Sequence, residues 1–154
     1  MPKVYQFVRK QTIKTDLISA WNFIRNPLNL NKITPPDMVF NILSHVPNEM
    51  YEGMIIRYKI KIPLLGEQNW VSELKHIKNK HSFVDDQRIG PYKFWYHYHQ
   101  ISENEEGVEF LDKITYAVPY GIFGEIVHFI YIKNQLRKIF DFRAKETPKL
   151  LNNN

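Results

Sequence analysis

The stretch from Phe83 to Ile101, FVDDQRIGPYKFWYHYHQI, restricts the possible folds of this chain more than any other. Two runs with the alternation of β-strands are separated by Gly90 and Pro91, a pair that is typical of turns. The pattern therefore predicts a β-hairpin. Because alternate residues of a strand point to the same face, one face of its second arm carries Trp95, His97, His99 and Ile101.

That face combines an indole ring with two imidazoles, which is unusual for a packed core. A polar group that is buried without a partner costs roughly 2 to 7 kcal/mol. If the face points inward, its residue types favour the wall of a ligand pocket over a solid interior.

The rest of the chain continues the strand pattern. Thr15 or Asp16 is the expected N-cap of a short helix that Pro27 ends, and a second short helix is expected over 28–33. The expected strands cover residues 3–12, 39–46, 54–62, 68–77, 81–89, 93–103 and 108–118. With no helices between the later strands, this order favours an antiparallel meander.

The last element is a long amphipathic helix, expected from Ile122 to about Arg143. Thr147 and Pro148 are expected to end it, so residues 1–147 form one domain and 148–154 a frayed tail. Its apolar stripe, predicted to cover the concave face of the sheet, consists of Ile122, Ile126, Phe129, Ile130, Ile132, Leu136, Ile139 and Phe140.

Composition narrows the classes of function. The 154 residues include no cysteine, which excludes disulfides and thiolate metal sites. No signal peptide and no apolar run of membrane-spanning length is visible, so we expect a cytoplasmic protein without integral membrane association. The net charge is +5, but the lysines and arginines are scattered and alternate with apolar residues. We therefore expect solvated outer faces, with no nucleic acid or anionic lipid bound through charge alone.

Several motifs carry a resemblance to a known family. They are Ile33-Thr34-Pro35-Pro36, the segment 83–92, Trp95-Tyr96-His97-Tyr98-His99, and Asp112 with Tyr116, Pro119 and Gly121. They resemble the SRPBCC superfamily (START-like, helix-grip), and most closely its cyclase/dehydrase-like or cell-division-inhibitor-like ligand-binding branch. The resemblance implies an α+β helix-grip fold: a seven-stranded antiparallel sheet wrapped around a long C-terminal helix, with two short helices after strand 1. Some members of that branch are fused to an epimerase, and we expect no fused epimerase domain here.

The expected turn over 104–107 fixes a register for the last hairpin. If Glu103 opposes Val108, then His99 opposes Asp112. The same register sets His97 beside Ile114 and Trp95 beside Tyr116. Across the preceding turn, Asp85 and Gln87 reach the same wall, whereas Asp86 points to the opposite face.

The leading hypothesis is a protein that binds a small hydrophobic or aromatic ligand between sheet and helix. Its predicted ligand-binding residues are Ile56, Tyr58, Trp70, Leu74, Phe83, Gln87, Trp95, His97, His99, Asp112, Ile114 and Tyr116. The alternative is a polyketide cyclase/dehydratase-like enzyme in the same cavity, with His97, His99 and Asp112 as candidate acid/base groups.

The two histidines also have a spacing that strand-borne metal sites use, with Asp112 or Asp85 as a third ligand. We favour hydrogen bonding to a ligand over this reading and expect no metal and no cofactor. The other histidines, at positions 45, 76, 81 and 128, belong to no motif and are expected on the surface or on a helix face.

Overall fold

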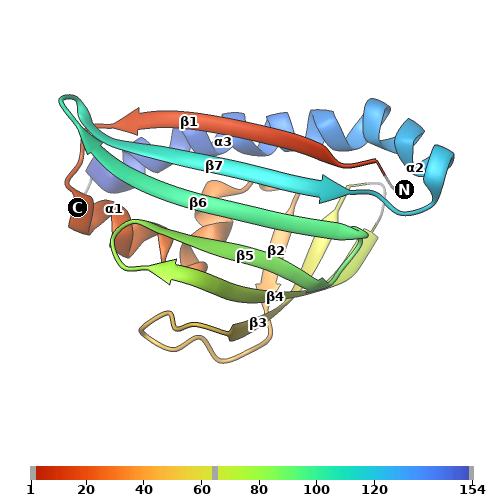
Figure 1. Cartoon of the computed structure of the whole chain (residues 1–154), viewed down its shortest axis with the longest axis horizontal. Helices are drawn as coiled ribbons and strands as arrows, with labels where there is room; N and C mark the ends of the chain where they lie inside the picture. The colour runs from red at the N-terminus through yellow and green to blue at the C-terminus, as the bar shows by residue number, and fades with distance from the viewer. Residues whose placement is uncertain (1–2, 64–65, 153–154) are drawn as a thin grey trace.

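The computed structural model describes residues 3–63 and 66–152 and confirms the predicted α+β helix-grip fold. Seven antiparallel strands form one sheet in the order β1-β7-β6-β5-β4-β3-β2 (Figure 1). The strands are β1 Tyr5–Ile13, β2 Val39–Ile42, β3 Met54–Ile62, β4 Gly66–Lys78, β5 Ser82–Ile89, β6 Phe94–Asn104 and β7 Gly107–Ala117.

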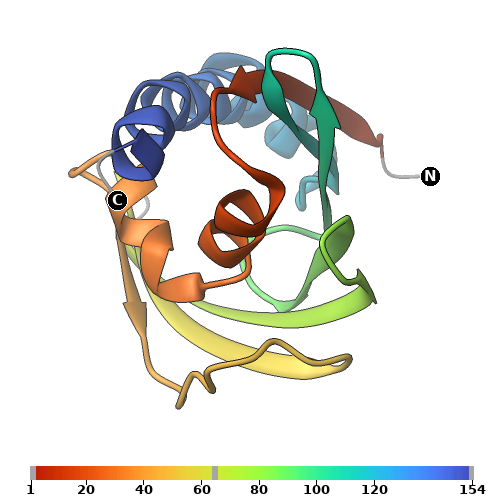
Figure 2. The same cartoon turned by 90° about the vertical axis from the view of Figure 1, so that its left-hand side faces the viewer.

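The sheet curls around the interior, and a long helical segment bridges its two edges (Figure 2). This segment consists of α2 (Gly121–Val127), a π-helical turn η2 (His128–Ile132) and α3 (Lys133–Asn152). Together they enclose a space whose walls are the concave face of the sheet and the inner face of the helix.

Two short helices after β1 close one end of this space (Figure 2). They are α1 (Leu17–Ile24) and the 3-10 helix η1 (Pro27–Ile33), as predicted. The Asp16 carboxylate accepts hydrogen bonds from the Ser19 N–H at 2.9 Å and the Ser19 hydroxyl at 2.6 Å, which confirms Asp16 as the N-cap.

Strand β3 shows why the sheet has a defined inner face. Its apolar side chains alternate with Arg57, Lys59 and Lys61, and all five inward positions are buried. A slip of one residue would bury the three cations instead, so the alternation fixes the register.

Strand β2 is shorter than the predicted 39–46, because it ends at Ile42. Leu43 still donates a hydrogen bond to the Arg57 carbonyl, but the Ser44 hydroxyl then accepts from the Arg57 N–H at 3.1 Å. A side chain takes the place of the next backbone partner, so the ladder stops. Of the turn expected after β3, Leu64 and Leu65 lie outside the described residues.

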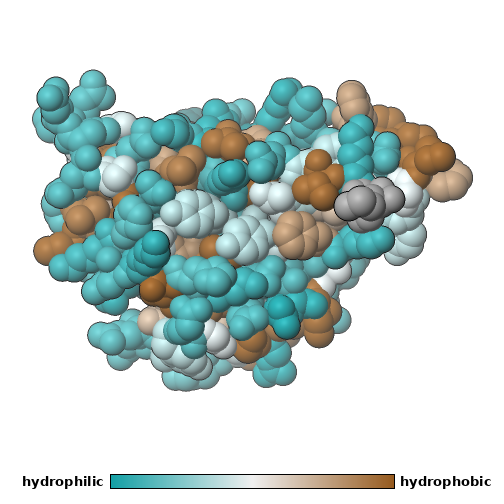
Figure 3. Space-filling model, viewed as in Figure 1, coloured by the Kyte–Doolittle hydropathy of each residue, from teal (hydrophilic) through white to brown (hydrophobic). Residues whose placement is uncertain are grey.

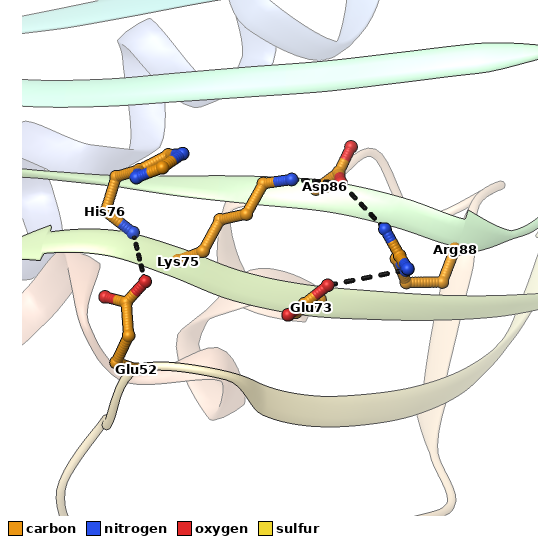
Figure 4. Close-up of polar contacts among 6 residues, drawn as sticks. All are labelled: Glu52, Glu73, Lys75, His76, Asp86 and Arg88. Atoms are coloured by element: carbon orange, nitrogen blue, oxygen red, sulfur yellow. Dashed lines mark hydrogen bonds and ion pairs between the residues drawn. The ribbon is translucent and has the colours of Figure 1, made fainter.

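The outer face of β4 and β5 carries a network of charged groups (Figure 4). Asp86 contacts Lys75 at 2.5 Å and Arg88 at 3.6 Å, and Arg88 also reaches Glu73. Asp86 thus points away from the interior that Asp85 faces, as predicted from their adjacent positions.

An irregularity near the end of β4 is held by Glu52 (Figure 4). His76 has a positive φ of 55°, and its N–H and that of Ile77 donate to the Glu52 carboxylate at 2.8 and 3.0 Å. The carboxylate replaces the strand partners that a bulge leaves unpaired.

The C-terminal helix differs from its prediction at both ends. It runs through Pro148 to Asn152, so the frayed tail predicted from residue 148 is wrong as far as Asn152. Burial of Leu151 together with Leu136, Phe140 and Thr147 accounts for the continuation, because packing offsets the lost backbone hydrogen bond of the proline.

The predicted apolar stripe is also wrong over its first half. Ile122, Ile126, Phe129 and Ile130 are 51–77% exposed, whereas Leu136 and Phe140 are buried. The π-helical turn changes the helical phase at His128, and α2 packs against η2 and little else. Among the described residues, no helix combines the length and apolar character needed to cross a membrane.

Candidate functional site

A cavity of about 520 Å³ lies between the concave face of the sheet and the C-terminal helix. Strands β3 to β7 supply one wall, and the helix supplies the other. Its lining is mainly aliphatic and aromatic and includes Leu30, Met38, Phe40, Tyr58, Ile60, Ile62, Trp70, Tyr92, Trp95, Ile114, Val127, Tyr131, Leu136, Ile139 and Phe140.

Three aromatic rings meet on the sheet side of this cavity. Trp70 and Trp95 pack edge to face with centroids 5.3 Å apart, and Tyr92 lies 4.7 Å from Trp95. The Trp70 indole N–H donates to the Ser72 hydroxyl at 3.0 Å, so its polar atom is satisfied. The rings therefore present stable apolar faces to a ligand.

The hairpin register matches the prediction: His99 opposes Asp112, His97 opposes Ile114 and Trp95 opposes Tyr116. The predicted turn over 104–107 is closed by the pairing of Asn104 with Gly107, whose φ is +140°. A side chain on Gly107 would also collide with the Ile13 carbonyl, so only glycine fits there.

The structure distributes the predicted ligand-binding residues over two cavities. Tyr58, Trp70, Trp95, His97 and Ile114 line the larger one. A smaller cavity of about 120 Å³ is lined by Ile56, Leu74, Phe83, His99 and Asp112 together with Tyr58 and His97.

Two predicted residues line neither cavity. The Gln87 side chain bonds the backbone of Tyr92, donating to its carbonyl at 2.8 Å and accepting from its N–H at 3.3 Å. It secures the β5–β6 turn. Tyr116 is buried, and its hydroxyl bonds His128 Nε2 at 2.8 Å.

Asp112 is the centre of a buried charged cluster. A single carboxylate oxygen, Oδ1, lies 2.8 Å from His97 Nε2, 3.0 Å from His99 Nδ1 and 3.7 Å from Arg143 Nη1. Burial acts to raise the pKa of Asp112, but the hydrogen bonds from both histidines hold that pKa well below its usual range. Asp112 is therefore an anion that positions the two imidazoles.

His97 is neutral in this cluster. Burial is the main cause, and His99 adds to it, so that the pKa of His97 falls to about 3 although Asp112 opposes the shift. A neutral imidazole of this kind hydrogen-bonds well but takes up a proton reluctantly.

Within the part of the chain that the structure describes, His97, His99 and Asp112 form the one group that could hold a metal ion. One ligand atom from each of His97, His99 and Asp112 lies within 4.8 Å of the others. Arg143 already supplies a positive charge to Asp112 from the helix side, so a cation would meet a guanidinium at close range. The expected absence of a metal stays a prediction.

Asp85 was not among the principal predicted residues, yet it lines both cavities. Burial raises its pKa, which a hydrogen bond with Ser72 partly opposes, and its Oδ1 has no hydrogen-bond partner. Asp85 lies opposite His97 in the β5–β6 ladder, which places it on the cavity wall. The predicted register of this hairpin was the sequence feature that could have identified Asp85 as a site residue.

Arg143 is a charged lining residue that sequence reasoning missed. It lies on α3, lines both cavities, and stacks over the Phe140 ring at 4.6 Å. Its Nε has no partner, so Arg143 keeps a free donor beside Asp112. Its charge kept it out of the predicted apolar stripe, although it follows Leu136 by seven residues and Phe140 by three and therefore lies on the same helix face.

His128 was expected on the surface or a helix face, and the surface placement is wrong. It is buried, and its ring stacks on Tyr5 at a centroid distance of 3.5 Å while Nε2 bonds Tyr116. The π-helical turn that begins at His128 directs the side chain inward. His45, His76 and His81 are exposed, as expected.

Comparison with known proteins identifies the fold. No family model matches the sequence, and neither does any curated protein. Among solved structures, a START superfamily protein from Mycobacterium smegmatis matches with a TM-score of 0.71 at 8% identity, covering 96% of this chain and 97% of that one. Ginseng major latex-like protein 151 from Panax ginseng matches with a TM-score of 0.69 at 12% identity and the same coverages. A Thermus thermophilus protein gives 0.71 at 11% identity, covering 94% and 95%.

These matches agree with the arrangement of sheet and C-terminal helix described above. The chain has the same helix-grip fold as these structures, so the fold that the SRPBCC resemblance implied is confirmed. At such low identities the likeness concerns the fold, and the cyclase/dehydrase-like or cell-division-inhibitor-like branch stays a prediction.

Proposed function

We propose that this chain binds a small, largely apolar or aromatic molecule in the cavity between sheet and C-terminal helix. The cavity itself is the observation that carries the proposal: about 520 Å³ with a mainly apolar lining is the size and character of small-molecule sites. The START-like fold of the matched structures is compatible with such a role.

The polar groups of the cavity indicate which ligands suit it. Asp85, His97 and Arg143 line both cavities, and we call them the polar cluster. Within it, Asp85 Oδ1 lacks a donor and Arg143 Nε lacks an acceptor, and both atoms are buried. A hydroxyl group can serve both, since it donates to the carboxylate and accepts from the guanidinium.

The favoured ligand therefore has an aromatic body with a hydroxyl group, as in a phenol or naphthol. The rings of Trp70, Tyr92 and Trp95 would pack against the body, and the polar cluster would orient the hydroxyl. Leaving either buried polar atom unpaired costs about 1–3 kcal/mol, so such a ligand gains affinity by relieving that cost.

Calorimetric titration with 2-naphthol tests the proposal. Wild-type protein should bind the probe, and Ile139→Trp should weaken binding because Ile139 lines the cavity and the larger indole would take up part of its space. The matched control is Ile18→Trp, which places the same ring on the exposed side of α1 and should bind as wild type does. Thermal unfolding of both variants checks whether they are folded.

Binding of 2-naphthol by Ile139→Trp with unchanged affinity would place the probe elsewhere and contradict the proposal. So would the absence of binding by the wild-type protein.

The alternative, a cyclase/dehydratase-like enzyme with His97, His99 and Asp112 as acid/base groups, stays a prediction. An effective general base has a pKa near the working pH, whereas the pKa of His97 is lowered to about 3. We therefore place binding ahead of catalysis.

A further inference from the structure

A cluster of exposed apolar side chains surrounds the entrance of the cavity. We call it the apolar tip, and it consists of Tyr120, Ile122, Phe123, Ile126, Val127, Phe129 and Ile130. Their exposed fractions run from 43% to 83%, although all seven are large hydrophobic residues within 11 consecutive positions. A contiguous apolar surface of this kind on a folded protein marks an interaction site.

The apolar tip projects at one end of the molecule. Figure 1 places α2 beyond the end of the sheet, and Figure 3 shows apolar side chains gathered at the same end. Gly124 anchors α2 there, because a Cβ on it would lie 1.8 Å from the Pro119 carbonyl oxygen. The exposed side chains are thus held outward by a close backbone contact.

Basic residues stand beside the apolar tip. The Lys133 ammonium lies 5.8 Å from the centre of the Phe129 ring. Lys3 lies over the Tyr5 ring, which in turn stacks on His128. Glu125 is the single acidic residue between Val118 and Lys133. Apolar side chains flanked by lysines are the pattern of segments that lie in the interface of anionic bilayers.

We propose that the apolar tip docks on an anionic phospholipid bilayer. The aliphatic and aromatic side chains would enter the boundary between headgroups and acyl chains, while Lys3 and Lys133 contact lipid phosphates. This goes beyond the proposed ligand binding, and it departs from the expectation drawn from the scattered charge, because the exposed apolar surface was not foreseen.

The position of the tip favours a membrane over a second copy of the chain. Tyr120, Phe123 and Val127 line the cavity as well as being exposed, so the cavity opens through the tip. A bilayer at this place would let an apolar ligand pass without crossing water. A symmetric dimer through the same surface would cover both entrances.

Vesicle co-sedimentation tests the proposal without any cavity ligand. Wild-type protein should sediment with vesicles of phosphatidylcholine and phosphatidylserine, and less with pure phosphatidylcholine or at high salt. The double variant Ile122→Ser/Phe129→Ser removes two exposed side chains that do not line the cavity. Its partition coefficient should fall about tenfold or more.

The matched control is Leu28→Ser/Ile89→Ser, which removes two equally apolar side chains that are 59% and 61% exposed elsewhere on the surface. It should sediment as wild type does. Wild-type protein left in the supernatant with both vesicle types would overturn the proposal, as would equal loss in the control.

Sedimentation velocity tests the competing possibility that the apolar tip binds a second copy of the chain. A monomer without vesicles is expected. A wild-type dimer that the tip variant dissociates, with no vesicle binding, would assign the surface to a second copy and overturn membrane docking. Because 2-naphthol titration measures the cavity separately, failure of one proposal leaves the other open to its own test.

Discussion

At the scale of single residues, Asp85 carries a cost to stability that is consistent with its proposed role in ligand binding. Its carboxylate is buried, and Oδ1 has no donor in the protein. Burial raises the pKa of Asp85, which means that folding disfavours its charged form. That cost to stability is fully present above the folded-state pKa, and it decreases as the pH falls from the folded-state pKa toward the ordinary pKa of an aspartate.

Asp85→Asn should therefore stabilise the fold at neutral pH. The expected gain in the free energy of unfolding near pH 7 is about 1 kcal/mol or more, and it should shrink toward pH 4, because protonation of the wild-type carboxyl removes the buried charge. The same variant should bind 2-naphthol roughly five- to tenfold more weakly, because it loses a charged acceptor. Urea denaturation at both pH values and calorimetry measure the two effects. A less stable variant near pH 7 would contradict this account of Asp85.

At the scale of elements, the strands could be predicted and the ends of the C-terminal helix could not. Alternation in β3 and the turn before β7 fix faces and register locally, so the neighbours of His97 and His99 followed from sequence. The helix depends on what surrounds it. Nothing in the sequence showed that the first turns of the helix, from Ile122 on, project beyond the sheet and stay exposed. Nor did it show that the packing of Leu151 would continue the helix past Pro148.

Arg143 was missed for a different reason. It follows Leu136 by seven residues and Phe140 by three within the regular helix α3, so helical spacing places it on their buried face, but a search for apolar residues passes over an arginine. A cation on the helix side was thus hidden from pattern analysis, although it contributes to the polar cluster.

The last turn of α3 provides a test at this scale. Leu151→Ala should lower the free energy of unfolding by about 2–5 kcal/mol, because Leu151 is 8% exposed and packs in the core. Leu28→Ala is the matched control at an exposed site and should change stability by about 0.5 kcal/mol or less. Equal, small effects in the two variants would show that residues after Pro148 are frayed after all.

At the scale of the whole molecule, the cavity and its entrance connect the ligand-binding and membrane-docking proposals. The inner faces of sheet and helix enclose a cavity with a polar cluster, and the exposed tip of the helix surrounds its entrance. The antiparallel order of the strands and the inward orientation of Trp95 and His97 could be predicted from the strand patterns, whereas the helix-grip fold was implied by the family resemblance. The division into two cavities could not, because it depends on how side chains from five strands and a helix fill the space.

The tryptophans permit the most direct test of the central claim, that a ligand enters the space beside Trp95. The chain has three of them: Trp70 and Trp95 line the larger cavity, whereas Trp21 is buried in the core beside Phe83 and lines neither cavity. Titration of ¹⁵N-labelled protein with 2-naphthol should shift the indole N–H resonances of Trp70 and Trp95 and leave that of Trp21 unchanged. Unchanged resonances for Trp70 and Trp95 at saturating probe, or a shift confined to Trp21, would contradict the account.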